Sequence, residues 1–211
     1  MKLEELRNQI VEYGKKMFHS SLVSGTGGNI SARDVDTGLV VITPTSMDYD
    51  KLSPEDIPIL DENGNLIEGK YPPSSETPMH TLVYRKRKDV FAIVHTHSKF
   101  ATAFSVALKE IPVVFLDLVL FVGGSVEVAE YRRPGTIELG EEGLRMLNNN
   151  SSNAVLLQNH GVLAIGSSLK KAFSAAVAVE DTAEIYYRAL ALGKYTVVPE
   201  EDVKFLSKLI P

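Results

Sequence analysis

The sequence predicts a single α/β domain over residues 1–211, with helices packed on a mixed sheet. Two observations predict this class. Stretches with helical periodicity alternate with short β-branched runs along the whole chain, without an internal repeat or a linker. An Asn63-Gly64 pair also stands between two short apolar runs, which is typical of a β-hairpin, so the sheet is not wholly parallel.

The first elements follow from the spacing of apolar residues. Near the N-terminus an apolar residue recurs at every third or fourth position, which predicts an amphipathic helix over about residues 2–20. The Ser/Gly-rich stretch 20–31 is then typical of a loop. Residues 39–42 are apolar and mostly β-branched, and they predict a strand that ends in a turn at 43–46.

The hairpin joins residues 57–60 to 65–67, and Pro58 restricts the first of these to a sheet edge or weakens it as a strand. Ser75 is expected to cap a helix that runs to about Lys88. The later elements alternate in the same way. Strands are expected at 90–94, 112–116, 126–129, 154–157 and 162–165, and helices at 99–108, 136–150 and 169–192.

Composition argues against several classes of protein. The chain carries 22 basic and 27 acidic residues, a net charge of −5, which argues against a nucleic-acid binder. The longest apolar run, Ile111 to Gly124, is shorter than the roughly 18 residues of a membrane span. The charged N-terminus predicts no secretory signal. The absence of cysteine fits a cytoplasmic location and leaves His and carboxylates as candidate metal ligands.

Three of the five histidines stand where a strand is expected to end. His95 and His97 follow the strand at 90–94, and residues two apart on a strand point the same way. His160 follows the strand at 154–157 in the same manner. Three neutral imidazoles with an open fourth position make a catalytic zinc site, although each ring could instead hydrogen-bond only to nearby backbone.

Two further residues could take part in chemistry at such a site. Glu76 stands at the start of the expected helix, where a carboxylate either complements the helix dipole or, beside a cation, acts as a general base. His80 lies four residues later on the same helical face, so it either bonds this carboxylate, lines the site or has a structural role.

Three loops rich in Gly, Ser and Thr offer backbone N–H groups and hydroxyls that can bind phosphate without a basic residue. They are Gly25–Asn29, Thr43–Ser46 and Ser74–Ser75. Each could also simply turn the chain, and the first matches neither a Walker A motif nor a dinucleotide-binding fingerprint.

Five motifs occur in this order between residues 25 and 161: Gly-Thr-Gly-Gly-Asn-Ile-Ser, Ile-Thr-Pro-Thr, Pro-Ser-Ser-Glu, His-Thr-His and Gln-Asn-His-Gly. With them the chain resembles the zinc-dependent class II sugar-phosphate aldolases, typified by L-fuculose-1-phosphate aldolase. The resemblance implies a class II aldolase/adducin-like three-layer sandwich with a largely antiparallel sheet. It also implies a homotetramer with its active site between neighbouring subunits.

The resemblance also implies roles for the motif residues. Zinc, or another divalent metal, would be held by His95, His97 and His160. Glu76 would act as the acid/base and could also bind the metal in the resting state. The phosphate pocket would use Gly28, Asn29, Thr45, Ser46, Ser74 and Ser75. The implied reaction is cleavage of a ketose 1-phosphate such as L-fuculose 1-phosphate to dihydroxyacetone phosphate and a short aldehyde such as lactaldehyde.

The sequence departs from the aldolase pattern on the aldehyde side. The family's tyrosine before the Gly-Gly pair is missing; Asp117 falls at its place when counted back from Gly123, and Leu116 does when counted forward from Pro112. An aspartate in an apolar run is costly unless satisfied, so Asp117 is either bonded to backbone or a proton donor or ligand for substrate. Pro134 replaces a family aromatic, and the family's C-terminal tyrosine is also missing, which leaves the aldehyde open.

Other functions within the superfamily are alternatives. L-ribulose-5-phosphate 4-epimerases have Asp where this chain has Glu76, which favours the aldolase, but residues 77–80 resemble the epimerase pattern. A methylthioribulose-phosphate dehydratase is the other enzymatic alternative. A non-catalytic adducin-like module is expected to lack the metal histidines, and all three are present.

Overall fold

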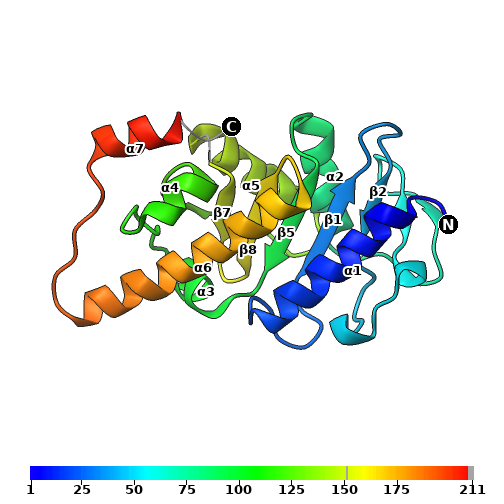
Figure 1. The fold of residues 1–211 in the computed structure, drawn as a ribbon, viewed down its shortest axis with the longest axis horizontal. Coiled ribbons are helices and arrows are strands. Elements are labelled where there is room, and N and C mark those ends of the chain that lie inside the picture. Colours follow the sequence, from blue (N-terminus) through cyan, green and yellow to red (C-terminus); the bar gives the residue numbers. More distant parts are fainter. Residues whose placement is uncertain (151, 209–211) are drawn as a thin grey trace.

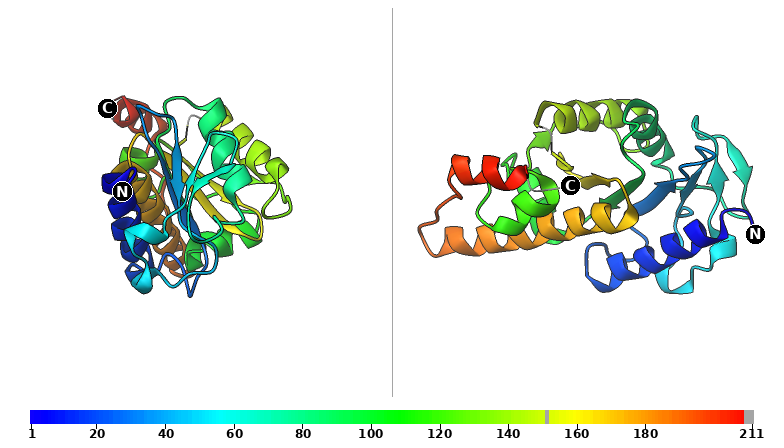
Figure 2. Two further views of the ribbon diagram at one scale, coloured as in Figure 1. Left: turned by 90° about the vertical axis from the view of Figure 1, so that its right-hand side faces the viewer. Right: turned by 45° about the horizontal axis from the view of Figure 1, so that its top comes forward.

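The computed structural model describes residues 1–150 and 152–208, and within them one eight-stranded sheet is covered by helices on both faces (Figures 1 and 2). The strands are β1 (Asn29–Arg33), β2 (Val40–Ile42), β3 (Ile59–Leu60), β4 (Leu66–Glu68), β5 (Ala92–Thr96), β6 (Val128–Ala129), β7 (Ala154–Leu157) and β8 (Gly161–Gly166). The helices are α1 (Glu4–His19), α2 (Thr77–Lys86), α3 (Lys99–Val106), α4 (Leu116–Val122), α5 (Ile137–Asn150), α6 (Leu169–Ala191) and α7 (Glu200–Ser207).

The strands lie in the order β4-β3-β2-β1-β5-β8-β7-β6. Neighbours run antiparallel except β6 and β7, which are parallel. The register pairs Asn29 with His95 and Thr96 with Val162. Consequently the starts of β1 and β8 and the ends of β2 and β5 lie at one edge of the sheet. The predicted α/β class with a mixed, largely antiparallel sheet is confirmed.

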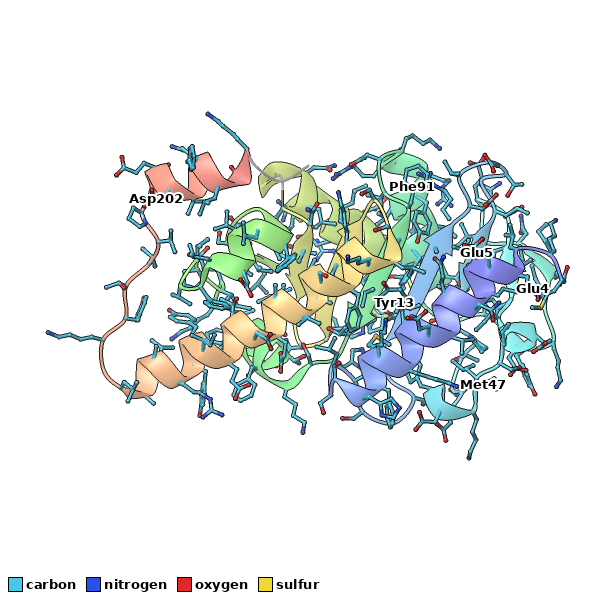
Figure 3. All side chains as sticks on the ribbon, viewed as in Figure 1. Glu4, Glu5, Tyr13, Met47, Phe91 and Asp202 are labelled. Carbon is cyan, nitrogen blue, oxygen red and sulfur yellow. The ribbon has the colours of Figure 1, made fainter. Side chains whose placement is uncertain are left out.

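A hydrophobic core lies on each face of the sheet, which gives the molecule three layers. On one face α1 and α6 lie side by side, and α3 and α4 pack on this same face. Helices α2 and α5 cover the other face (Figures 1 and 2). Successive residues of β5 face opposite cores, so Val94 packs on the first side and Ile93 on the second. Tyr13 of α1 lies toward α6 (Figure 3), its ring 5.5 Å from that of Phe173.

Most predicted elements are present, with ends that differ by a few residues. The strand expected at 90–94 is β5, which both begins and ends two residues later. His95 therefore belongs to the strand itself. The loop expected at 20–31 is shorter, because β1 starts at Asn29. This strand has a single β-branched residue, and it is held by pairing with β2 and β5 on its two sides. No helix in the described part of the chain is long and apolar enough to cross a membrane.

Two predictions are wrong. The segment 112–116 forms no strand but leads into α4, because the apolar side chains that follow pack onto α6 with helical spacing. Ser75 does not cap α2; Glu76 holds that position, and its backbone N–H donates to the Ser74 hydroxyl at 3.2 Å. Helix α7 was not predicted, and it packs against α4 (Figure 1).

Candidate active site

The three predicted metal histidines meet at the edge of the sheet where β5 ends and β8 begins. His95 lies in β5 and is fully buried, His97 follows that strand, and His160 lies in the turn between β7 and β8. One ligand nitrogen from each ring lies within 4.8 Å of the other two. The antiparallel pairing of β5 with β8 therefore brings together imidazoles from two separate motifs.

Two glycines let the backbone approach these histidines closely. A Cβ on Gly161 would lie 2.0 Å from the Thr96 carbonyl oxygen and 3.0 Å from His97 Cδ2. Gly28 has a φ of +67°, and a Cβ there would lie 2.6 Å from the His95 carbonyl oxygen. A side chain at either position would push apart the segments that carry the ligands. This packing requirement of Gly28 adds to the phosphate-binding role predicted for it.

The imidazoles are prepared to act as ligands. The Nδ1 atom of His95 lies 2.8 Å from the Val162 carbonyl oxygen, and since a carbonyl only accepts, Nδ1 carries the proton. Its Nε2 therefore carries a lone pair and lies 3.0 Å from Nε2 of His97. Burial lowers the pKa of His95 to about 3 and that of His160 to about 4, and desolvation also lowers the pKa of His97. Neutral rings have the lone pair that a metal requires.

Glu76 completes the cluster from the start of α2, and its side chain does not cap that helix. Its carboxylate is buried, with Oε2 3.1 Å from His95 Nε2 and Oε1 3.3 Å from His160 Nε2. The lone pair on His95 Nε2 and the Glu76 oxygen that faces it repel one another unless a cation or a proton lies between them. Three imidazoles and one carboxylate are a common ligand set of zinc, so these residues fit a divalent metal.

The three Gly/Ser/Thr loops meet at the same edge of the sheet. Thr43 N–H donates to the Ile30 carbonyl at 2.9 Å, and Ser74 N–H donates to the Thr43 carbonyl at 3.1 Å, which ties the loops together. Asn29 is buried, and its Oδ1 has no hydrogen-bond partner among the described residues. These loops adjoin Glu76 and carry the residues predicted to bind phosphate, namely Gly28, Asn29, Thr45, Ser46, Ser74 and Ser75.

The structure places Asp117 apart from this cluster within one chain. It lies on α4 and lines a groove against α6 with Phe121, Phe173 and Asp181. Desolvation raises the pKa of Asp181, and the nearby carboxylates, Asp117 among them, raise it further. A catalytic role for Asp117 therefore requires that it act on the site of a neighbouring subunit, and it stays a prediction.

His80 is fully buried and has a polar partner other than Glu76. Its Nδ1 lies 2.6 Å from the Ser31 hydroxyl, which in turn lies 2.7 Å from the Tyr84 hydroxyl. Burial and the neighbouring His95 lower the pKa of His80 to about 3. The structural role that the sequence analysis allowed for His80 agrees with this network between α2 and β1.

Comparison with known proteins identifies the family. The model of the class II aldolase and adducin N-terminal domain matches residues 8–187 of the chain. The chain belongs to this family. Its sequence is 41 % identical over 208 residues to a 5-deoxy-D-ribulose 1-phosphate aldolase from Bacillus thuringiensis, covering 99 % of this chain and 96 % of the relative.

Two further relatives agree with this assignment. The L-fuculose phosphate aldolase of Escherichia coli K12 is 38 % identical over 204 residues, covering 96 % of this chain and 93 % of that protein. A solved structure of L-fuculose 1-phosphate aldolase superposes with a TM-score of 0.92 at 36 % identity, covering 97 % of this chain and 95 % of its own. The chain is thus a class II aldolase that acts on sugar phosphates, and this class depends on a metal.

Proposed function

We propose that the protein catalyses the reversible, zinc-dependent cleavage of a ketose 1-phosphate to dihydroxyacetone phosphate and a short aldehyde. The observation that carries the proposal is the cluster of His95, His97, His160 and Glu76 beside the three joined loops. The relatives' names point to L-fuculose 1-phosphate and 5-deoxyribulose 1-phosphate. Both are deoxy ketose 1-phosphates, and breaking their C3–C4 bond gives dihydroxyacetone phosphate.

The residues divide the chemistry between them. His95, His97 and His160 would hold the zinc ion, which when bound supplies Lewis-acid stabilisation of negative charge on oxygen. Glu76 lies next to these ligands and moves the proton at C3, the carbon that is left with an electron pair when the C3–C4 bond breaks. The loops bind phosphate through backbone N–H groups and hydroxyls, which explains why no lysine or arginine lies in their motifs.

The other half of the reaction takes the proton from the C4 hydroxyl. Asp117 is our candidate for this group, acting on the active site of a neighbouring subunit in a homotetramer. Exposed apolar side chains on the same helix support burial of α4 in such an interface: Leu116, Leu120 and Phe121. The mass of the protein in solution tests the tetramer, and a monomer would remove Asp117 from the mechanism. A cytoplasmic location stays a prediction from the absence of cysteine.

The deciding experiment follows release of dihydroxyacetone phosphate with a coupled NADH-dependent dehydrogenase. The substrates are 5-deoxy-D-ribulose 1-phosphate, L-fuculose 1-phosphate and L-ribulose 1-phosphate, each with and without a chelator, and the metal content is measured in parallel. Release that stops with chelator and returns with Zn²⁺ would support the proposal. A protein that binds zinc but releases nothing from any of the three would contradict it and favour epimerase or dehydratase chemistry.

A further inference from the structure

Helix α3 begins two residues after His97, and the side chain of its N-cap residue makes no capping hydrogen bond. Ser98 occupies the N-cap position with extended backbone angles, but its hydroxyl accepts no hydrogen bond from the first turn. The first backbone N–H groups of a helix lack partners within that helix and have to be satisfied from elsewhere. The position of this helix start matters, because it determines where His97 stands.

The partner of this helix start is a carboxylate from α6. Glu180 Oε1 accepts from Phe100 N–H and Oε2 accepts from Ala101 N–H, both at 2.9 Å. These are the second and third residues of α3, the two N–H groups that an N-cap side chain normally serves. The negative charge also complements the positive end of the helix dipole.

Aromatic contacts support the same arrangement. The Phe100 ring lies 5.6 Å from that of Tyr187, and one turn further along α3 the Phe104 ring stacks on Tyr186 at 5.1 Å. Helix α6 also packs against β5, the strand that leads into His97. Glu180 therefore ties α3, the helix after His97, to α6. Helix α6 also supports β5, the strand before His97.

His97 depends on this backbone more than His95 does. The Nδ1 of His95 is held by the Val162 carbonyl, whereas no described residue accepts or donates a hydrogen bond at Nδ1 of His97. His97 is an exposed residue flanked by two glycines, and a Cβ added at either Gly27 or Gly161 would lie 3.0 Å from its ring. Its direction is therefore set chiefly by the segment between β5 and α3.

We propose that Glu180 is a positioning residue for the metal centre, which holds His97 in ligand geometry by capping α3 from α6. The inference rests on the proposed metal site and concerns metal affinity rather than turnover. Residues that hold metal ligands in place typically contribute about 10–100-fold to metal affinity. We expect a loss in this range for Glu180→Ala and a smaller loss for Glu180→Gln, which keeps one acceptor oxygen and the side-chain volume.

The test measures Zn²⁺ affinity by competition with a chromophoric chelator, and the visible spectrum of the Co²⁺-loaded protein, which reports ligand geometry. The matched control is Glu184→Ala, since Glu184 lies one turn later on α6 and pairs with Arg188 instead of α3. This control is expected to bind Zn²⁺ within about twofold of the wild type. The double variant His97→Ala/Glu180→Ala is expected to bind no more weakly than His97→Ala alone, because Glu180 acts through His97.

Three outcomes would overturn the inference. Unchanged Zn²⁺ affinity and Co²⁺ spectrum in Glu180→Ala and Glu180→Gln, with only a lower melting temperature, would leave Glu180 a purely structural cap. Losses that add in the double variant would mean that Glu180 does not act through His97. Absence of metal binding by the wild type would remove the proposed metal centre as well, which distinguishes that failure from the first two.

Discussion

Replacement of Gly161 by alanine is the most direct test of how the site is held. The added Cβ would lie 2.0 Å from the Thr96 carbonyl oxygen, and 3.0 Å from His97 Cδ2. Carbon–oxygen contacts between strands settle at about 3.3–3.6 Å, so β5 and β8 would have to separate by roughly 1.3 Å or more at this point. The neighbouring pair Thr96 and Val162 lies in the part of the ladder that would open.

The expected cost follows from this separation. Overpacking a closely packed position costs about 1–3 kcal/mol, and each backbone hydrogen bond lost from the ladder about 0.5–1.5 kcal/mol. We therefore expect Gly161→Ala to lower the free energy of unfolding by about 2–5 kcal/mol. The same shift moves His97 relative to His160, and a displacement near 1 Å can cost about 10²-fold in turnover.

Urea unfolding of the metal-free protein measures the first effect, and the coupled aldolase assay measures the second. Gly124→Ala is the matched control, because a Cβ there meets no atom within 4 Å and the backbone is not left-handed. Its stability is expected to change by less than about 0.5 kcal/mol. Wild-type stability and turnover in Gly161→Ala would refute the close packing of β5 on β8 as the basis of the site.

Four further predictions concern titratable groups. Glu76→Gln is expected to keep its metal while cleavage falls by about 10²–10⁴-fold, and full activity would contradict the acid/base role of Glu76. His95→Ala is expected to lose metal in elemental analysis, and full metal content would contradict its role as a ligand. Asp117→Asn is expected to lower turnover, whereas Asp181→Asn, across the same groove, is not; equal effects would argue against Asp117 as a proton carrier. Burial holds the pKa of His95 at about 3 and that of His160 at about 4, so the unfolded chain takes up protons first, near pH 6.5. The unfolding free energy of the metal-free protein is therefore full above that pH and falls as the pH drops toward 4, and a flat profile in urea unfolding would contradict this.

Local spacing was enough to predict which residues could meet, because it depends only on strand and helix geometry. The pattern at His95 and His97 indicated two side chains on one side of the chain, and both rings do meet His160, His95 from the end of β5 and His97 from just beyond it. Strand β1, which the sequence analysis did not predict, and helix α4 could not be recognised in the same way. Asn29–Arg33 has little β-propensity and becomes a strand through its neighbours, and the apolar run that contains α4 is compatible with either structure until α6 is beside it.

The geometry of the site depends on contacts between residues far apart in the sequence. The proton on His95 Nδ1 is set by Val162, 67 residues away, and the cap of α3 by Glu180, 80 residues from Phe100. Neither partner can be recognised by a sequence motif. Any residue can supply a backbone carbonyl, and a glutamate is common on a long helix. The ligand set is therefore recognisable from sequence, whereas the arrangement that makes it a metal site follows from the register of β5 on β8 and from α6, which packs against both.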